Sequence, residues 1–370
     1  MAETILILSN SDSGLYDFRR EVLEELLGQG MRVLVSVPDT GYVDRIKGLG
    51  CEYLPTSFNR RGMNPFADLA LLRFYLGLMR HFRPKAVLTY TIKPNIYGGL
   101  AARLTGTPYL VNITGLGTTL EGSGPLQKMI VLMYRTALKK ASCVFFQNKG
   151  NRDFMVKKGC VTGKTRVIPG SGVNLEEYRA ENYPEDTGSV IFVSIMRLMR
   201  DKGIGELLEA AERVHRSHPE TVFRLLGAYE EESRDKYEPL VKRLTEEGVL
   251  EYYGYRDDVP AFLKECQAVV HPSYHEGMSN VLLEAAATAR PVLASAVEGC
   301  LDTFRDGISG ISFAPGSGGE LAAALERFLA LSWEERKEMG LRGREYVEEH
   351  FDRRLVTAAY MEELRQATGR

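Results

Sequence analysis

Residues 271–285 read HPSYHEGMSNVLLEA, and they indicate how the second half of this chain is built. An apolar strand leads into the stretch, a loop carries Glu276, and a helix begins near Asn280 with Glu284 inside its first turns. Gly277 lets the backbone approach a ligand closely, and the free N–H groups at a helix start suit a diphosphate. One turn further on, the Glu284 carboxylate can accept hydrogen bonds from ribose hydroxyls. The stretch therefore predicts a nucleotide site on a strand–loop–helix unit.

A second motif lies upstream, where residues 193–203 read VSIMRLMRDKG at the end of another apolar strand. Arg197 and Lys202 in this motif can place two cations against a leaving diphosphate, where preorganised positive charge contributes most. Taken alone, the two residues are also compatible with ordinary solvated surface cations. Their place ahead of the 271–285 stretch, in one run of strands and helices, favours the diphosphate site.

Short apolar strands alternate with amphipathic helices along the whole chain, which predicts parallel, doubly wound sheets. In the first half the expected strands are Ile5–Ser9, Arg32–Val37, Cys51–Pro55, Ala86–Thr89, Tyr109–Ile113 and Cys143–Gln147. In the second half they are Val190–Ile195, Thr221–Leu226, Leu250–Tyr253, Ala268–His271, Val292–Ala294 and Gly310–Phe313. Helices are expected at Asp17–Gln29, Pro65–His81, Tyr97–Leu104, Leu126–Lys140, Ile204–His215, Tyr237–Glu247, Val281–Ala289 and through Trp333–Arg370.

Two domains follow from this alternation and from a chain length of 370 residues. We expect an acceptor-binding domain over 1–175 and a nucleotide-sugar-binding domain over 188–349, joined by the Pro- and Gly-rich segment Pro169–Asp186. A last helix at about 350–370 is expected to pack back on the first domain. The fold class is α/β, with two Rossmann-like domains facing each other across a cleft and ligands outside the carboxyl ends of the strands.

Charge and cysteine content restrict the environment and the partners. The net charge of −2 combines a basic half, with 24 Lys and Arg against 14 Asp and Glu in residues 1–180, with an acidic second half. A basic first half suits an anionic partner such as a phospholipid surface or a lipid diphosphate, although uneven surface charge explains it equally well. Five scattered cysteines without a Cys-x-x-Cys pair fit a reducing compartment. Neither a signal peptide nor an apolar run of membrane-spanning length is recognisable.

Polar residues that follow strands in the first half are candidates for the acceptor site. Ser13 and Gly14 follow the first strand, where backbone N–H groups could meet a phosphate, although an ordinary turn explains them as well. Lys93 follows the fourth strand and is expected to point into the cleft, and Thr114 and Gly115 follow the fifth. We expect Ser13, Lys93, Thr114 and Gly115 to contact the acceptor.

These motifs resemble those of the retaining family-four glycosyltransferases, which have the two-Rossmann architecture called GT-B. The family's Arg…Lys-Gly pair and Glu-x7-Glu motif are matched by Arg197, Lys202-Gly203, Glu276 and Glu284. The resemblance implies that Arg197 and Lys202 hold the donor diphosphate, that Glu276 lies beside the donor sugar and that Glu284 holds the ribose. It assigns further donor contacts to residues of the base-binding loop, the 271–285 stretch and the first strand–helix turn: Arg256, Gly277, Met278, Ser279, Asn280 and Gly14.

A narrower resemblance involves the segments 57–66 (SFNRRGMNPF), 115–117 (GLG) and 297–300 (VEGC). They are similar to those of bacterial α-1,3-N-acetylgalactosaminyltransferases that act on polyprenyl-diphosphate-linked glycans, and of related capsule and O-antigen transferases. This implies a UDP-sugar donor, with UDP-GalNAc as the best choice, and a polyprenyl-diphosphate-linked acceptor. Asn112 and Thr114 stand where many family members have His, and Asp302 stands where many have Glu, so those roles do not transfer.

The resemblance also implies transfer with retention of the anomeric configuration and without a protein nucleophile. Because the sequence contains no Asp-x-Asp, we expect no metal and no other cofactor, with Arg197, Lys202 and helix N–H groups taking the metal's part. The basic amphipathic stretches Leu126–Lys140 and Phe66–Lys85 either pack on the sheet or lie in a lipid interface. We expect a cytoplasmic protein bound peripherally to the anionic inner face of the membrane, with no nucleic-acid partner.

Other functions compatible with a two-domain cleft remain open. A nucleotide-sugar epimerase would need no acceptor, a sugar phosphorylase would use a similar cleft, and a nucleotide-sugar sensor would bind the donor without turnover. A dehydrogenase is disfavoured because no Gly-x-Gly-x-x-Gly follows either first strand. The six histidines show no metal-ligand spacing, and His275 is better explained as an ordinary loop residue than as a donor contact.

Overall fold

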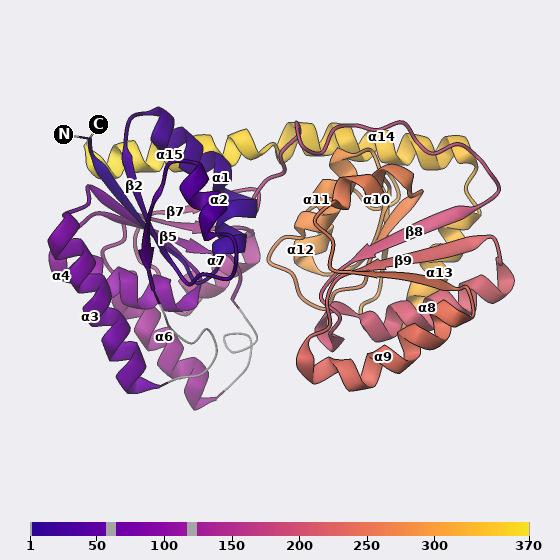
Figure 1. The fold of residues 1–370 in the computed structure, drawn as a ribbon, viewed down its shortest axis with the longest axis horizontal. Coiled ribbons are helices and arrows are strands. Elements are labelled where there is room, and N and C mark those ends of the chain that lie inside the picture. Colours follow the sequence, from indigo (N-terminus) through magenta and orange to yellow (C-terminus); the bar gives the residue numbers. More distant parts are fainter. Residues whose placement is uncertain (1, 57–63, 117–123, 370) are drawn as a thin grey trace. The chain divides into compact units, whose positions relative to one another are not determined.

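The computed structural model describes residues 2–56, 64–116 and 124–369, which form two compact units (Figure 1). The first unit comprises Met1–Ser171 and Arg353–Arg370, and the second comprises Gly172–Asp352. Each unit is built on a parallel sheet with helices on both faces, so the predicted α/β class with two doubly wound domains is confirmed. Most of the 57–66 segment and the glycine at position 117 lie outside the described residues.

The sheet of the first unit has seven strands in the order β3-β2-β1-β4-β5-β6-β7. Its strands are β1 (Thr4–Leu8), β2 (Arg32–Val37), β3 (Glu52–Pro55), β4 (Ala86–Tyr90), β5 (Tyr109–Ile113), β6 (Cys143–Phe146) and β7 (Thr165–Val167). All neighbouring strands run parallel, and the central ones are buried almost throughout, because helices cover both faces.

Alternate residues of these strands face two different helical layers. Ile5 and Ile7 pack with α1 (Asp12–Gly28), α2 (Val43–Gly48) and α15 (Arg353–Thr368). Leu6 and Leu8 pack with the other layer, which contains α3 (Pro65–Phe82), the π-helix η1 (Pro94–Gly98), α4 (Gly99–Thr105), α6 (Pro125–Ala137) and α7 (Lys149–Lys157). The helix expected from Asp17 begins five residues earlier, because Ser11 caps its N-terminus.

The sheet of the second unit has six strands in the order β10-β9-β8-β11-β12-β13. They are β8 (Val190–Ile195), β9 (Thr221–Leu226), β10 (Leu250–Gly254), β11 (Ala268–His271), β12 (Val292–Ser295) and β13 (Gly310–Phe313). One face carries α8 (Ile204–Ser217), α9 (Glu231–Glu246) and α13 (Gly318–Leu329), and the other carries α10 (Val259–Glu265), α11 (Asn280–Ala287), α12 (Glu298–Leu301) and α14 (Trp333–His350). A short 3-10 helix, η2 (Arg200–Lys202), follows β8.

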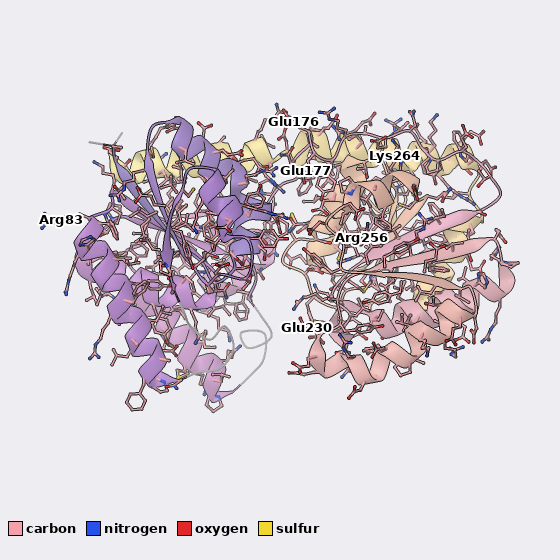
Figure 2. All side chains as sticks on the ribbon, viewed as in Figure 1. Arg83, Glu176, Glu177, Glu230, Arg256 and Lys264 are labelled. Carbon is pink, nitrogen blue, oxygen red and sulfur yellow. The ribbon has the colours of Figure 1, made fainter. Side chains whose placement is uncertain are left out.

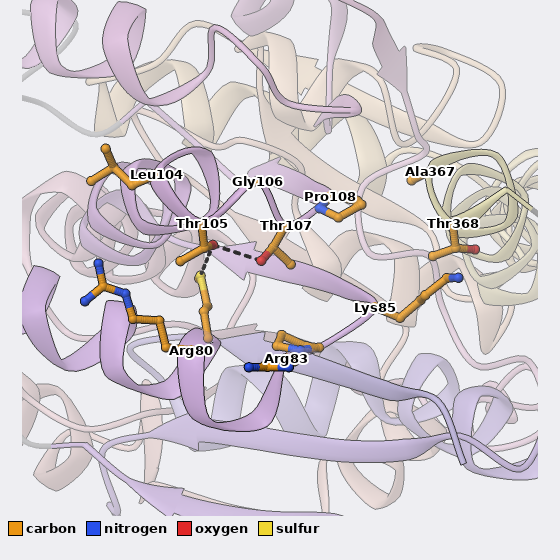
Figure 3. Close-up of a pocket in the computed structure, with 12 residues that line it drawn as sticks. Arg80, Arg83, Lys85, Leu104, Thr105, Gly106, Thr107, Pro108, Ala367 and Thr368 are labelled. Carbon is orange, nitrogen blue, oxygen red and sulfur yellow. Dashed lines mark hydrogen bonds between the residues drawn. The ribbon is translucent and has the colours of Figure 1, made fainter. Parts of the chain in front are cut away.

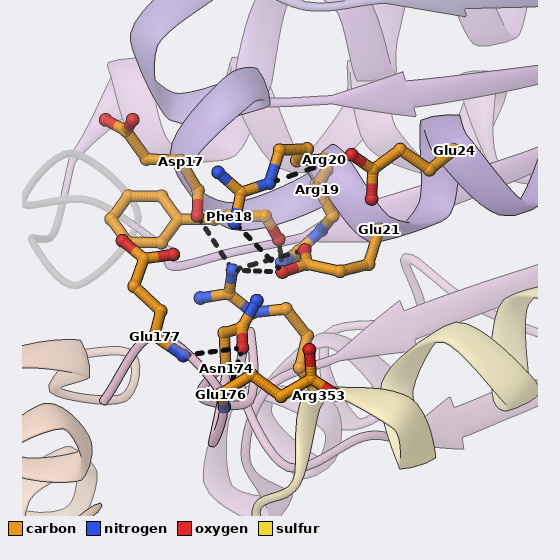
Figure 4. Close-up of polar contacts among 10 residues, drawn as sticks. All are labelled: Asp17, Phe18, Arg19, Arg20, Glu21, Glu24, Asn174, Glu176, Glu177 and Arg353. Atoms are coloured by element: carbon orange, nitrogen blue, oxygen red, sulfur yellow. Dashed lines mark hydrogen bonds and ion pairs between the residues drawn. The ribbon is translucent and has the colours of Figure 1, made fainter. Parts of the chain in front are cut away.

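The segment from Trp333 onward, expected to be helical, forms two helices, α14 and α15, separated at Phe351 and Asp352. The break is held by backbone pairing in the second unit, where Val173 N–H donates to the Phe351 carbonyl at 2.8 Å. The next residue, Arg353, is fastened to α1: its guanidinium lies 3.0 Å from the Asp17 carbonyl and 3.0 Å from Glu21 Oε1 (Figure 4). These contacts fix the start of α15 on the first unit.

In each sheet the strand order reverses beside the first strand of the unit. β1 lies between β2 and β4, and β8 lies between β9 and β11. At such a reversal the helices after the two strands leave on opposite faces, so the loops at the carboxyl ends diverge and leave room for a ligand. The carboxyl ends of β8 and β11 carry the two motifs of the second unit, which is where the site is built.

Candidate functional site

The centre of the candidate site is a contact between those two motifs. Lys202, at the end of η2, donates from Nζ to Glu276 Oε1 at 2.6 Å, and Ser273 Oγ lies 3.5 Å from the same ammonium. His271, the last residue of β11, places Nε2 at 2.9 Å from the same carboxylate oxygen. Because a carboxylate only accepts, His271 donates from Nε2. Lys202 and Glu276, which are 74 residues apart in sequence, thus meet at the point where the strand order reverses.

The Glu276 carboxylate is held in its ionised form. Burial alone would raise its pKa, but the hydrogen bonds and charges of His271 and Lys202 outweigh burial and lower the pKa to about 2. The group is therefore a carboxylate throughout the neutral range, so it can accept hydrogen bonds or balance positive charge. It does not act as a proton donor at neutral pH.

Two glycines let the loops come this close. Gly203 has φ of +75°, and a Cβ there would lie 2.1 Å from the Pro272 carbonyl oxygen. A Cβ on Gly299, at the start of α12, would lie 2.3 Å from the Glu276 carbonyl oxygen. Both positions therefore require glycine for steric reasons. Gly299 belongs to the 297–300 segment, which packs directly behind the Glu276 loop.

The N-terminus of α11 lies next to Glu276 and presents polar groups at the same edge. Ser279 is the N-cap residue, and Asn280 Oδ1 is buried without a hydrogen-bond partner among the described residues. Glu284, partly buried, follows one turn into the helix. The Met278 side chain packs in the core with Leu283, so its contact with a ligand would be made by the backbone, as would that of Gly277. The arrangement offers helix N–H groups, an acceptor and a carboxylate beside one ammonium.

The two arginines predicted for this site are paired with acids on neighbouring loops. Arg197 is 57% exposed and donates to Glu230, which follows β9, at 2.7 Å. Arg256, which follows β10, makes a two-pronged pair with Asp258 at 2.8 and 2.7 Å. Figure 2 labels Glu230 and Arg256 on the same side of the second unit. Lys202 is thus the cation that this structure holds against Glu276, while Arg197 lies on the solvent side.

In the first unit the turn after β1 uses its own backbone donors. Gly14 N–H donates to Ser11 Oγ at 3.0 Å, and Ser13 N–H donates to the Asp12 carboxylate at 2.9 Å. Asp12 is fully buried and also accepts from the backbone N–H groups of Thr40 and Tyr42. Burial opposes ionisation of Asp12, but a hydrogen bond from the Thr40 hydroxyl and these backbone hydrogen bonds together lower its pKa. A ligand at Ser13 or Gly14 would have to replace capping bonds.

The loops after β4 and β5 hold the other acceptor candidates. Lys93 Nζ lies 2.9 Å from Asp68 of α3, so its charge is balanced within the first unit. Thr91, two residues earlier, has φ of +72°, an unusual conformation for a β-branched residue and typical of functional loops. Thr114 is partly buried, and among residues 2–56, 64–116 and 124–369 a Cβ on Gly115 would meet nothing within 4 Å.

Asn112, which stands where many family members have His, makes hydrogen bonds inside the core of the first unit. Its Nδ2 donates to the Thr89 carbonyl at 3.0 Å, its own carbonyl accepts from Asn95 at 2.8 Å, and its Oδ1 accepts from Tyr360 of α15. The amide therefore links β4, β5 and α15 inside the core. A buried side chain with all these partners is not available to a substrate.

Sequence reasoning missed His271, Ser273 and Gly299 as site residues. His271 is the strongest omission, since it is buried and orients Glu276, while its Nδ1 has no hydrogen-bond partner in the described part of the chain. The sequence pattern gives His271 no metal-ligand spacing and so no evident role. A signal that could have found it is its place at the end of a strand, five residues before an acid on the same loop.

A large hollow of about 720 Å³ lies elsewhere, at the amino-terminal edge of the first unit's sheet (Figure 3). It is lined by Arg80, Arg83 and Lys85 and by Thr105 and Thr107, whose hydroxyls are 2.9 Å apart. Because Lys85 precedes β4 and Thr107 precedes β5, the hollow is at the opposite end of the sheet from the loops described above. It is not part of the candidate site.

Comparison with known proteins identifies the family and the fold of this chain. Residues 14–170 match the family described as "Glycosyl transferase 4-like domain", and residues 176–346 match "Glycosyl transferases group 1". The Campylobacter jejuni N,N'-diacetylbacillosaminyl-diphospho-undecaprenol alpha-1,3-N-acetylgalactosaminyltransferase is 26% identical over 323 residues, which are 82% of this chain and 83% of that protein. An Escherichia coli UDP-Gal:alpha-D-GlcNAc-diphosphoundecaprenol alpha-1,3-galactosyltransferase is 28% identical over 280 residues, 71% of this chain and 70% of its own.

Solved structures share the fold over nearly the whole chain. HepE from Anabaena, solved in complex with UDP and glucose, superimposes with a TM-score of 0.79 at 18% identity and covers 97% of this chain and 98% of its own. A sucrose-phosphate synthase from Thermosynechococcus elongatus superimposes with a TM-score of 0.80 at 20% identity, covering 98% of both chains. These likenesses extend through both units.

Proposed function

This chain belongs to the GT-B glycosyltransferases, whose two family domains match residues 14–170 and 176–346, and we propose that it transfers GalNAc from UDP-GalNAc to a polyprenyl-diphosphate-linked glycan. The observation that carries the donor half of this proposal is the Lys202–Glu276 contact beside the N-terminus of α11. The acceptor half rests on the two relatives whose names specify undecaprenol-linked diphosphate sugars. The proposed product is a lengthened lipid-linked glycan for surface polysaccharide or glycoprotein assembly.

On the donor side, Lys202 and the N–H groups at the start of α11 bind the diphosphate, and Glu284 binds the ribose. The Lys202 ammonium then exchanges its contact with Glu276 for a phosphate oxygen, and Glu276 remains beside the sugar. Arg197 reaches the same diphosphate by leaving Glu230, which costs little because exposed ion pairs contribute only about 0–1 kcal/mol. Arg256, together with Tyr253 and Tyr255 beside it, contacts the uracil base of the donor.

The transfer itself needs one bond to break and one to form on the same face of the sugar. The bond between the anomeric carbon and the UDP oxygen breaks, and the acceptor hydroxyl oxygen bonds to that carbon. The hydroxyl proton passes to the leaving phosphate oxygen, so the anomeric configuration is retained and no protein nucleophile is used. The protein contributes positioning and charge stabilisation. Ser13, Lys93, Thr114 and Gly115 of the first unit are the proposed acceptor contacts, with Lys93 first leaving Asp68.

We place the reaction at the cytoplasmic face of the membrane, with the protein bound peripherally. All five cysteines are buried and none forms a disulfide, as expected of a reducing compartment. Within residues 2–56, 64–116 and 124–369, the longest apolar helices fall short of what crossing a bilayer requires. The lipid-linked acceptor proposed above supplies the reason for the protein to visit the membrane.

The donor assignment predicts a ranked panel of reaction rates. UDP release is measured with UDP-GalNAc, UDP-GlcNAc, UDP-Gal, UDP-Glc and GDP-mannose, each with and without a polyprenyl-diphosphate-linked glycan. We expect UDP-GalNAc to react fastest and only when the acceptor is present, because the acceptor hydroxyl is the nucleophile. If another UDP-sugar reacts fastest, the proposed donor is wrong, but the proposed glycosyltransferase function stands. Conversion of a donor without acceptor would instead indicate the epimerase.

Metal independence gives a second prediction. Since Lys202 and helix N–H groups are proposed to balance the diphosphate charge, the rate in 5–10 mM EDTA, a concentration chosen to be about 10³-fold above trace metal, should stay within about twofold of the rate with Mg²⁺. Released UDP is again the readout. A rate that falls to background in EDTA and returns with Mg²⁺ or Mn²⁺ would contradict the assignment of charge stabilisation to the protein.

A further inference from the structure

The two helical layers of the first unit differ in charge. Helices α3, α4 and α6 on one face carry five Lys and Arg and one acid, Asp68, which Lys93 already neutralises. Helices α1, α2 and α15 on the other face carry seven Lys and Arg against eight Asp and Glu. Helices α3, α4 and α6 thus carry a net positive charge, whereas α1, α2 and α15 together carry a slight negative charge. Such a charge balance favours an anionic partner on the face that α3, α4 and α6 form.

The same layer holds most of the unit's exposed apolar side chains. In the described part of the first unit, eight large apolar residues are exposed, and six of them belong to α3, α4 or α6. Phe66 is 85% exposed and Leu132 is 62% exposed, values that a packed core would not leave. The opposite, buried faces of both helices pack into the core, through Tyr75 of α3 and Tyr134 of α6. The exposed apolar residues are therefore not part of that packing.

Five of these exposed residues gather at one end of the layer, in the first two turns of α3 and α6. They are Phe66, Leu69, Leu126, Met129 and Leu132. Since α3 follows β3 and α6 follows β5, both helices begin at the carboxyl edge of the sheet, at the lower end of the first unit in Figure 1. The loop with Thr114 and Gly115 follows β5 at this edge too. One exposed cation, Lys128, lies among the apolar turns of α6. Others come after these turns, at Arg73 on α3 and at Arg135, Lys139 and Lys140 on or just after α6.

We propose that the first two turns of α3 and α6 dock on an anionic lipid bilayer, with the five apolar side chains in the interface and the cations against the headgroups. An amphipathic surface with large apolar residues and flanking Lys or Arg binds such interfaces through apolar burial and charge together. A second copy of this chain is a poorer occupant, because two faces with five cations and one neutralised acid each would repel. A lipid surface supplies the anionic charge that the face lacks.

This inference rests on the proposed function, because it gives the acceptor loop a route to a lipid-linked glycan. Docking through the first turns places the carboxyl edge of the first unit's sheet at the bilayer. The diphosphate headgroup of the acceptor lies at that same depth, so Thr114 and Gly115 meet it without extraction of the lipid. Membrane binding and chemistry are nevertheless separable, since the docking residues are distinct from every proposed substrate contact.

The test compares sedimentation of the full chain with vesicles of phosphatidylcholine alone and with 30–40% phosphatidylglycerol, a range that gives roughly the surface potential of an anionic leaflet. The wild-type chain should sediment with the anionic vesicles and lose binding as salt rises. Phe66→Ser with Leu132→Ser should weaken binding at least about tenfold, because two large apolar side chains leave the interface.

Lys128→Glu should weaken binding and reduce its salt dependence. The matched controls are Leu355→Ser and Arg365→Glu, which change an exposed leucine and an exposed arginine of α15 on the opposite face.

The outcomes separate docking from catalysis. Each variant is also assayed for UDP release with a water-soluble, short-chain acceptor, and its thermal midpoint is measured. Docking variants that keep rate and midpoint but lose vesicle binding support the surface. Binding equal to wild type in the docking variants, or equal losses in the α15 controls, overturns it. So does a wild-type chain that ignores anionic vesicles, or a dimer in solution that Phe66→Ser dissociates. Loss of UDP release in the wild-type chain would count against the proposed function instead.

Discussion

Replacing Lys202 with alanine is expected to lower kcat/KM by about 10²- to 10³-fold, the effect of removing one preorganised group that stabilises transition-state charge. Lys202 Nζ is the cation held at the β8–β11 reversal, where the proposed function places the leaving diphosphate and its developing negative charge. Most of the loss should fall on kcat, because the charge is largest in the transition state. Steady-state UDP release over a range of donor concentrations measures both parameters.

The control for this variant is Lys264→Ala, which removes an exposed lysine of the second unit paired only loosely with Glu181 at 3.7 Å. It should leave the rate within twofold, on the order expected of an exposed ion pair. Lys202→Ala also leaves the Glu276 carboxylate without its ammonium, so its pKa rises toward the ordinary range. Lys202→Met keeps the aliphatic stem and should lose as much rate as alanine. A Lys202→Met enzyme at near-normal rate would show that the charge is not used.

Replacing Glu284 with alanine is expected to lower kcat/KM by about 10²-fold, because a hydrogen bond to a charged group contributes about 1.5–3 kcal/mol, or roughly 10- to 150-fold. Glu284 is one turn inside α11, whose N-terminus is proposed to hold the diphosphate, so we expect its carboxylate to face the ribose. The loss should appear mainly in KM, because the ribose contact is the same in the ground and transition states. Glu284→Gln should retain part of the activity through its remaining acceptor oxygen.

Deoxyribose donors make this prediction specific. If Glu284 binds ribose hydroxyls, the wild-type enzyme discriminates against 2′-deoxy or 3′-deoxy UDP-sugar, and Glu284→Ala loses that discrimination. The matched control is Glu246→Ala, an exposed glutamate of α9 that should behave as wild type in every assay. Equal discrimination in wild type and Glu284→Ala would assign the ribose to another group, whatever the overall rate.

The fold was predictable from sequence because its strands are buried on both faces. Tyr109–Ile113, Val190–Ile195 and Thr221–Leu226 are short apolar runs between turn residues, and the structure has strands with these same bounds. Short or polar elements were missed, including β7 at Thr165–Val167, whose three residues are all only partly buried. Such an edge strand has no continuous apolar pattern to detect.

The site was predictable only as far as its motifs are local. The 271–285 stretch carries Glu276 and Glu284 in one strand–loop–helix, so their closeness follows from sequence spacing. The ion-pair partners of the charged residues cannot be predicted in this way. Arg197 pairs with Glu230 and Lys93 with Asp68 across 33 and 25 residues, and no periodicity links either pair. These contacts depend on which loops the strand order brings to the same edge.

The C-terminal helix shows the same limit. Residues 333–370 have helical character throughout, and the sequence places the start of a last helix only at about residue 350, without showing what ends α14 at Phe351–Asp352. The break depends on backbone pairing with Val173, almost 180 residues earlier in the chain. Likewise, the use of Asn112 as a link to Tyr360 requires α15 to return to the first unit. Both features follow from tertiary contacts that local sequence does not contain.

The most direct measurement is a crystal structure of this chain with UDP bound. The second unit should hold the diphosphate at the β8–β11 reversal, with Lys202 Nζ within about 3 Å of a phosphate oxygen and both Glu284 oxygens facing the ribose hydroxyls. Lys202 should then have moved from Glu276, while His271 still donates to that carboxylate. UDP bound at another place, or at this place with Lys202 and Glu284 turned away from it, would contradict the account.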